Sequence, residues 1–260
     1  MSIKKISNIL KSVNIHLFGV CNFDDVKNSL IPCAAKNRLP RDPKRVIVAL
    51  FPYKVEDTPP KNISRYAAVP DYHAVCGKML ENATNKLKTL FPENQFAYFI
   101  DNSPIPEVQA AVLAGLGVRG QNGLLITKRF GSYVFIGEIV TDLELPYTSF
   151  KEDCPGCGRC KSMCPTKMQG REVCLSHITQ KKKELSKEET TLIHKHKTLW
   201  GCDICQECCP LNKKAEKTYI KEFIEGYRPH FAPGEDSTGR VYAWRGEKPI
   251  FRNFKIINPD

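Results

Sequence analysis

Short continuous hydrophobic runs alternate with helical spacing of apolar residues through the first 145 positions of the chain. The apolar run at 46–51 ends at Pro52 and predicts a buried strand. From Tyr72 to Phe91 the apolar residues recur at helical spacing, which predicts a long helix that covers a sheet. Residues 95–100 give the next strand, whereas residues 1–44 show no strong periodicity.

Asp101 follows the second predicted strand directly. Ser103 and Pro104 have the preferred order of a helix N-cap and first helical residue, so a helix is expected to begin at Pro104. Asp101 should therefore occupy a strand-to-helix turn. Residues 124–128 and 133–141 read as a hairpin-like pair of strands. Because strands and helices are interleaved, the first part of the chain is predicted to be α/β or α+β.

The pattern changes at a dense run of cysteines. Cys154, Cys157, Cys160 and Cys164, followed by Pro165, have the spacing that bacterial ferredoxins use to hold 4Fe-4S clusters. In two-cluster ferredoxins the fourth cysteine of such a run ligates the other cluster, so the motif requires further thiolates. They are present downstream, at Cys174, Cys202, Cys205, Cys208 and Cys209. The cysteines therefore predict two iron-sulfur clusters and electron transfer.

Two alternatives use the same residues. Paired cysteines also suit tetrahedral zinc, although zinc sites rarely need four cysteines in one run that ends in Cys-Pro. A disulfide framework needs an oxidising compartment. The N-terminus leads into no apolar stretch that could act as a signal peptide, and no segment approaches the roughly 20 apolar residues of a membrane span. We therefore expect a cytoplasmic protein without a membrane association.

Length and charge add two expectations. The chain has 260 residues and 42% hydrophobic content, so a larger domain should precede the cysteine-rich part, with a boundary near 145–147. The formal charge is +11, and lysine concentrates at 181–183, 195–197 and 213–217, around the second group of cysteines. A phosphate backbone would be attracted to such a surface, but solvated helix faces give the same pattern.

Several segments together resemble the epoxyqueuosine reductase family, QueG. The resemblance spans roughly residues 45–212, and the order of its motifs is specific. Its segments are Arg65-Tyr66-Ala67, Asp71-Tyr72-His73, residues 101–104, 114–126 and 137–146, Trp200-Gly201-Cys202-Asp203, and Cys209-Pro210-Leu211-Asn212.

The resemblance implies an α+β protein with an N-terminal α/β cobalamin-binding-like domain at 1–146. A ferredoxin-like domain with two 4Fe-4S clusters would follow at 147–215, and a C-terminal helix and tail at 216–260. The implied activity is the conversion of epoxyqueuosine to queuosine in tRNA, which is the last step of queuosine synthesis. A low-potential donor such as a ferredoxin or flavodoxin would supply the electrons.

The resemblance also implies roles for individual residues. Asp101 matches the family's proposed general acid, although sequence alone favours an Asx turn or a cap for an aspartate in this position. Contacts to cobalamin are expected from five residues, namely Tyr72, His73, Gly120, Gln121 and Asn122. The family binds its corrinoid without a histidine ligand, so a surface or structural role, and not cobalt ligation, is expected for His73, His177, His194 and His196. Two roles stay open for Tyr72 and His73, which are lining the corrin pocket and capping the long helix.

The cluster ligands follow from the same family pattern. It assigns Cys154, Cys157, Cys160 and Cys209 to the first cluster, and Cys164, Cys174, Cys202 and Cys205 to the second. Cys208 then competes with Cys209 for one position, which the following proline and the family pattern give to Cys209. The cysteines outside both motifs, Cys21, Cys33 and Cys76, are expected in the core.

Two features depart from the family pattern. Gln121 stands where the family usually has lysine, and the chain ends at Asp260, before the helical-repeat domain with which typical members grip tRNA. A short form of the enzyme is therefore expected, and three consequences stay open: weaker tRNA binding, compensation by the basic surface, or a different substrate. Two other functions remain open: a corrinoid-dependent reductase of another small substrate, and a two-cluster electron carrier of the ferredoxin type.

Overall fold

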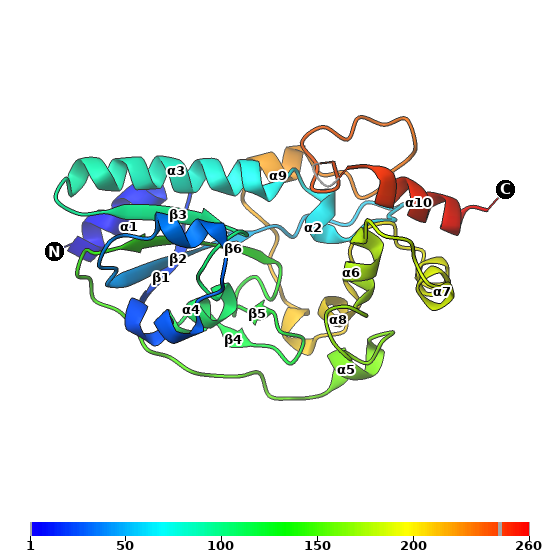
Figure 1. Cartoon of the computed structure of the whole chain (residues 1–260), viewed down its shortest axis with the longest axis horizontal. Helices are drawn as coiled ribbons and strands as arrows, with labels where there is room; N and C mark the ends of the chain where they lie inside the picture. Colours follow the sequence, from blue (N-terminus) through cyan, green and yellow to red (C-terminus); the bar gives the residue numbers. More distant parts are fainter. Residues whose placement is uncertain (1, 244–245, 260) are drawn as a thin grey trace. The chain divides into compact units, whose positions relative to one another are not determined.

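The computed structural model describes residues 2–243 and 246–259 (Figure 1). Contacts divide the chain into two compact units that do not follow chain order. Unit 1 comprises residues 1–52 and 72–156, and unit 2 comprises residues 53–71 and 157–260. The expected division of function near residue 146 stays a prediction.

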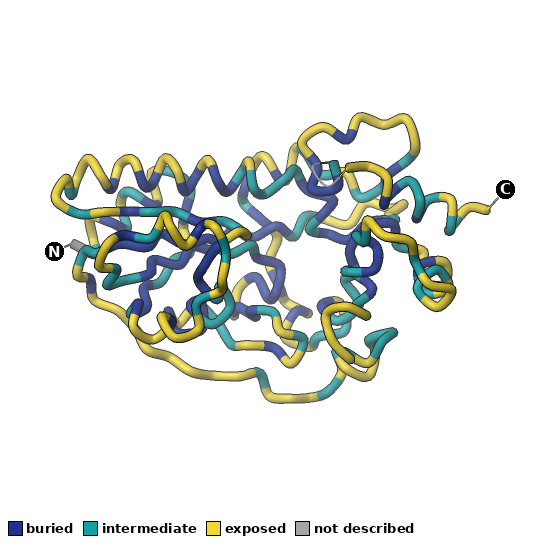
Figure 2. The backbone as a smooth tube through the Cα atoms, viewed as in Figure 1, coloured by how far each residue is buried: buried dark blue, intermediate teal, exposed yellow. Residues whose placement is uncertain are grey.

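Unit 1 is built on an antiparallel four-stranded sheet with the order β1-β2-β6-β3. Its strands are β1 (Leu17–Asn22), β2 (Arg45–Pro52), β6 (Val134–Thr141) and β3 (Phe96–Ile100). Two further short strands, β4 (Val118–Arg119) and β5 (Leu125–Ile126), pair with each other. β2 is buried almost along its whole length because it lies inside the sheet, as its continuous apolar run predicted (Figure 2).

Helices cover both faces of this sheet. The long helix α3 (Tyr72–Leu90) packs on β3 and β6, and α1 (Ser2–Ser12) packs on α3 (Figure 1). α4 (Glu107–Leu113) packs on β1, β2 and β6. Side chains alternate along β6, so Gly137 faces Leu80 of α3 while Glu138 points to the α4 side. Three short 3-10 turns, η1 (Phe23–Asp25), η2 (Lys27–Ser29) and η3 (Ala34–Arg38), connect β1 to β2.

Two local predictions in unit 1 are wrong. The helix after Asp101 begins at Glu107 with Pro106 as its cap, because a residue before proline avoids the helical region and Ile105 precedes Pro106. Ser103 does not cap it, since its hydroxyl accepts a hydrogen bond from the Ile105 backbone N–H at 3.1 Å.

The predicted hairpin of residues 124–128 and 133–141 is also wrong. β5 pairs with β4, whereas β6 pairs with β2 and β3 in the main sheet. Only a bridge between Thr127 and Gly131 closes the loop between them. Alternating apolar residues favour a strand but do not identify its partner.

Unit 2 is made of short helices around a buried aromatic group. Trp200 and Phe231, each 1% exposed, both meet the Tyr242 ring edge to face. The helices are α2 (Arg65–Ala68), α5 (Arg159–Met163), α6 (Leu175–Gln180), α7 (Lys187–His196), α8 (Ile204–Glu207), η4 (Pro210–Asn212), α9 (Lys221–Glu225) and α10 (Lys248–Ile257). No described helix has the length and apolar character needed to cross a membrane.

Gly19 should be essential to the packing of β1 against the end of α4. A Cβ atom there would lie 2.3 Å from the Ala114 carbonyl oxygen, which is backbone and cannot give way easily. We expect Gly19→Ala to lower the free energy of unfolding by about 1–3 kcal/mol in urea denaturation. Gly77→Ala in α3 is the matched control, because its Cβ would meet only Ile100 at 3.8 Å and alanine favours the helix by about 0.5–1 kcal/mol. Equal effects of the two substitutions would contradict this packing.

Candidate functional site

Asp101 lies where β3 turns toward α4. Its backbone adopts φ +59°, a left-handed conformation that aspartate and asparagine tolerate better than most residues. The Asn102 N–H donates to the Ile100 carbonyl and the Ser103 N–H donates to the Asp101 carbonyl, each at 2.8 Å. This tight turn leaves the Asp101 side chain 53% exposed. The sequence predicted this strand-end position correctly.

His73 and an aromatic stack lie beside Asp101. The Nε2 atom of His73 is 3.2 Å from Oδ2 of Asp101. The His73 ring stacks on Tyr72 at 4.2 Å between centroids, and Tyr72 stacks on Phe135 of β6 at 4.3 Å. The start of α3 thus presents flat side chains and an imidazole next to the carboxylate. Sequence reasoning named Tyr72 and His73 but missed Phe135.

A cavity of about 530 Å³ adjoins this group on unit 1. Its walls include His73 and Asn102, together with the cations Arg38 and Lys78 and the carboxylate of Glu81. The cavity is therefore lined by both cationic and anionic side chains that can form hydrogen bonds to a bound molecule.

Two carboxyl groups lie behind Asp101. The Asp101 backbone N–H hydrogen bonds to the Glu107 carboxyl, and burial, followed by the nearby charge of Asp101, raises the Glu107 pKa to about 8. Glu138 is 0% exposed. Burial and then the charge of Glu107 raise the Glu138 pKa well above its ordinary value. Sequence reasoning missed both, although an isolated glutamate in the apolar run of 134–141 was a signal.

Gly120, Gln121 and Asn122 form a separate turn between β4 and β5. The Gly120 N–H donates to the Leu124 carbonyl at 2.8 Å, and the Asn122 side chain accepts from the Leu124 N–H at 3.2 Å. A Cβ at Gly120 would lie 2.4 Å from the Asn122 side-chain oxygen, so a larger residue there would displace the Asn122 side chain. Gln121 is exposed at its tip. The turn belongs to the second sheet, on different elements from Asp101 and His73.

The cysteines of unit 2 gather in two groups. The thiols of Cys160, Cys209 and Cys157 act electrostatically on Cys208, and those of Cys205 and Cys174 act on Cys202. The first group spans α5 and α8, which pack together. Cys154 belongs to the end of unit 1, where its N–H donates to the Arg119 carbonyl at 2.9 Å.

No cysteine among the described residues forms a disulfide. Cys21 and Cys76 are buried as expected, whereas Cys33 is half-buried. Within residues 2–243 and 246–259, no group of three or more histidine, cysteine, aspartate or glutamate side chains is arranged to hold a metal ion.

Cys164 lies in an environment that favours a thiolate. Burial acts to raise its pKa, but the Thr166 hydroxyl and the backbone N–H groups of Thr166, Met168 and Lys167 more than offset it, so that the pKa is lowered. Lys167 and Met168 both have positive φ, at 52° and 56°, which turns successive N–H groups toward one point. Such nests of N–H groups recur at iron-sulfur sites. The residues around Cys164 therefore fit a cluster.

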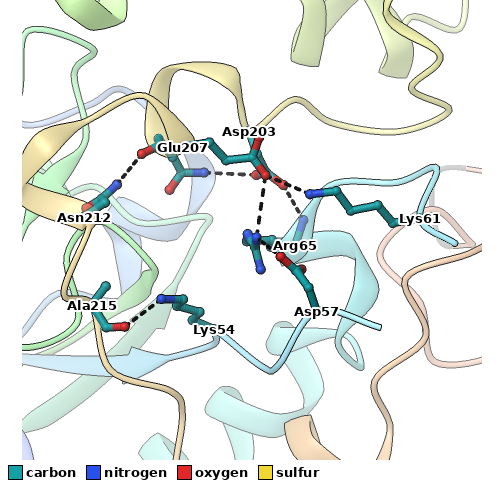
Figure 3. A network of polar contacts seen from close by, with 9 residues as sticks. Lys54, Asp57, Lys61, Arg65, Asp203, Glu207, Asn212 and Ala215 are labelled. Atoms are coloured by element: carbon teal, nitrogen blue, oxygen red, sulfur yellow. Dashed lines mark hydrogen bonds and ion pairs between the residues drawn. The ribbon is translucent and has the colours of Figure 1, made fainter. Parts of the chain in front are cut away.

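A polar network holds the loop that carries Cys202 and Cys205 (Figure 3). Asp203 is half-buried, and its carboxylate accepts from the Arg65 backbone N–H at 2.7 Å and from the Gln206 amide at 3.2 Å. Burial raises the pKa of Asp203 to about 6.

The Arg65 guanidinium extends this network to other carboxylates. It pairs with Asp57 and lies 3.6 Å from Glu207, which also pairs with Lys61 at 2.8 Å. Two motifs that are distant in sequence, Arg65-Tyr66-Ala67 and Trp200-Gly201-Cys202-Asp203, are thus joined in unit 2.

Comparison with known proteins identifies the family of the chain. Residues 35–102 match the model of the family described as epoxyqueuosine reductase QueG, DUF1730. The epoxyqueuosine reductase of Listeria monocytogenes is 31% identical over 246 residues, which cover 84% of this chain and 64% of the relative. The chain belongs to the epoxyqueuosine reductase QueG family.

Two further family members show how much of each chain is covered by the similarity. The epoxyqueuosine reductase of Gloeobacter violaceus is 38% identical over 165 residues, which cover 60% of this chain and 51% of that relative. The solved structure of the enzyme from Streptococcus thermophilus superposes with a TM-score of 0.81 at 25% identity, covering 99% of this chain and 81% of that one. The chain thus spans about half to two thirds of the length of these curated QueG relatives.

The raised pKa of Glu107 should make the stability of this QueG member depend on pH. The folded state holds a proton between the unfolded pKa near 4.5 and the folded pKa of about 8, so the free energy of unfolding should fall as pH rises through this window. Urea denaturation between about pH 6.5 and pH 8.5 avoids most of the titration of Asp203.

Glu107→Gln should flatten this pH dependence, because a neutral amide has no proton to lose. Exposed Glu93→Gln is the matched control and should keep the wild-type slope. An unchanged slope in Glu107→Gln would show that Glu107 is ionised in the folded protein at neutral pH.

Substitutions of the adjacent cysteines should separate their roles. Cys209→Ser should reduce iron content after anaerobic reconstitution, because a 4Fe-4S cluster needs its fourth thiolate. Cys208→Ser should leave the iron content close to that of the wild type. A larger loss in Cys208→Ser would assign the ligand to Cys208.

Proposed function

We propose that the chain is an iron-sulfur- and cobalamin-dependent reductase that converts epoxyqueuosine to queuosine in tRNA. The observation that carries the proposal is the placement of Asp101. In a member of the QueG family, a half-exposed carboxylate stands at a tight strand-end turn, 3.2 Å from an imidazole and directly in front of buried carboxyl groups.

The reaction sets clear chemical demands. Removing the epoxide oxygen breaks two C–O bonds and leaves a carbon–carbon double bond. It consumes two electrons and two protons and releases water. An enzyme for this step therefore needs a low-potential electron source, a group that delivers protons to the departing oxygen, and a pocket that orients the epoxide.

The cysteines would supply the electron path. Cys154, Cys157, Cys160 and Cys209 would hold one 4Fe-4S cluster, and Cys164, Cys174, Cys202 and Cys205 the other, with electrons from a low-potential ferredoxin or flavodoxin. The N–H nest around Cys164 and the network on Asp203 support this assignment, because hydrogen bonds orient cluster ligands and tune their potentials.

Cobalamin, when bound, would supply a strongly reducing centre for the carbon–oxygen bond cleavage. Tyr72, His73, Gly120, Gln121 and Asn122 are the residues proposed to hold it. The stacked rings of Tyr72 and His73 fit a flat macrocycle, and the glycine turn at Gly120 offers backbone groups and an amide side chain. Gln121 provides a neutral donor where relatives in the family have a cation.

Asp101 would deliver protons to the epoxide oxygen. Its fixed backbone turn aims the carboxyl outward, and His73 holds one carboxyl oxygen in place. The cavity walls beside it carry Arg38, Lys78 and Asn102, which can donate hydrogen bonds to an oxygenated substrate. The positions of these groups support a role for Asp101 in proton delivery.

The proposed nucleic-acid partner has a physical basis in charge. The formal charge of +11 would attract a phosphate backbone. Not every lysine is available, since Lys181 is paired with Glu189. One solved epoxyqueuosine reductase with the same fold was crystallised with an epoxyqueuosine-modified tRNA stem loop.

The direct test is an anaerobic assay. The protein is reconstituted with iron, sulfide and cobalamin, supplied with a low-potential reductant, and given epoxyqueuosine-containing tRNA. Mass spectrometry of the nucleosides should show loss of one oxygen only when cobalamin is present. Bound cobalamin without conversion would overturn the tRNA substrate and favour a corrinoid reductase of another small molecule. Absence of cobalamin binding would favour a two-cluster electron carrier.

Asp101→Asn should lower the rate of conversion by about 10²–10⁴-fold, the usual contribution of a positioned acid. Asparagine suits the positive φ of this position, so iron content and cobalamin binding should be unchanged. Glu93→Gln, exposed and remote in sequence from the turn, serves as the control. Wild-type turnover in Asp101→Asn would remove Asp101 from the proton path.

A further inference from the structure

We propose that Glu107 and Glu138 form a buried proton store that reloads Asp101 from inside unit 1. The catalytic part of this inference rests on the proposed function, whereas the protonation of the pair and its path to solvent do not. The argument starts from where the three carboxyl groups lie.

The three carboxyl groups form a series of increasing burial. Asp101 is 53% exposed on its side chain, and its backbone N–H binds the Glu107 carboxyl. Oε1 of Glu107 is buried without a hydrogen-bond partner. Glu138 comes last, at 0% exposure, within the sheet. The series therefore runs from the candidate pocket into the core.

Among the described residues, no cation is found to act on the buried Glu138 carboxyl. Both of its carboxyl oxygens lack a hydrogen bond of normal geometry in the described structure. In the sheet it stands opposite Val48 on β2 and Phe99 on β3, both buried apolar residues. An ionised carboxylate in such surroundings is very costly, so the group takes up a proton instead.

The charged and titratable neighbours agree with a protonated pair. Glu107 is faced by Asp101, whose charge opposes its ionisation while its backbone N–H favours it, and by His73, whose charge favours it. Around Glu138, the Ser103 hydroxyl weakly favours ionisation, and Glu107 opposes it. Cys21 of β1 is neutral, because burial, Asp25 and Glu138 raise its pKa to about 12. Two carboxyl groups that repel each other in this way share at least one proton at neutral pH.

The stoichiometry of the reaction gives this store a use. Departure of the epoxide oxygen as water takes two protons, but one carboxylic acid delivers only one before it must be reprotonated. Asp101 is half-exposed beside His73, and a protonated carboxyl group next to it shortens the path by which it is reprotonated. Proton transfer from the carboxyl pair to the Asp101 carboxylate is unfavourable in free energy when taken alone. The complete transfer is favourable because the proton ends on an alkoxide or hydroxide oxygen, which is far more basic than a carboxylate.

Infrared spectroscopy can detect the shared proton of Glu107 and Glu138 directly. The spectrum is measured on the reconstituted protein, labelled with ¹³C-glutamate, at about pH 7.5. A carbonyl band of protonated glutamate is expected in the wild type and in Glu93→Gln. It should be lost in the Glu107→Gln, Glu138→Gln double variant. Absence of the band from the wild type overturns the store, even if the double variant does not fold.

The path of the proton from Glu138 to solvent is tested by transferring the protein into D₂O and following hydrogen exchange. Because Glu138 is fully buried, its proton should exchange through Glu107 and Asp101, so Asp101→Asn should slow the shift of the band about tenfold or more. Exchange at the wild-type rate in Asp101→Asn would overturn the path.

Turnover separates this proposal from the proposed function. Glu138→Gln should lower kcat about tenfold or more with little change in KM, and the deficit should grow as pH rises. Equal kcat in Glu138→Gln and wild type at every pH would overturn the catalytic use of the store. If the wild type converts no epoxyqueuosine, the proposed function fails, while the band and its exchange still decide the store.

Discussion

The architecture of unit 1 depends on one constraint, which is that β6 carries a carboxyl group into the middle of a sheet packed on both faces. Glu138 lies between Val48 and Phe99, and α4 places Glu107 on the same side. The charge must be neutralised there, and a shared proton does this at lower cost than ionisation. Asp101, at the end of the neighbouring strand, links this core to the surface through its own backbone N–H.

The cysteine-bearing loops of unit 2 lie among short helices, with little regular structure around them. A set of polar contacts holds these loops in place. Asp203, next to Cys202, receives the Arg65 backbone N–H, and Arg65 reaches Asp57 and Glu207 in turn. Gly201 permits the close approach, because a Cβ there would lie 1.9 Å from the Ser64 hydroxyl. This explains why segment 53–71 groups with residues 157–260 and not with its neighbours in sequence.

The sequence allowed prediction of the features that depend on local pattern. Strand 46–51, the helix from Tyr72 and the position of Asp101 after a strand all follow from periodicity and are confirmed. The pairing partners of the strands and the first residues of the helices could not be predicted as well from the sequence. The start of α4 depends on Pro106, and the pairing of β5 with β4 is a tertiary choice that alternation does not encode. The carboxyl pair and the Asp203 network join residues about 30 and 138 positions apart, so only the fold reveals them. The cluster ligands and cobalamin contacts stay predictions.

The central claim is that this chain carries both an electron path and a corrin beside Asp101. Elemental analysis of one anaerobically reconstituted, desalted sample tests it most directly. Two 4Fe-4S clusters and one cobalamin predict about eight iron atoms and about one cobalt atom per chain. Iron without retained cobalt would contradict a cobalamin-dependent reductase and leave an electron carrier. Retained zinc in place of iron would contradict the electron path itself.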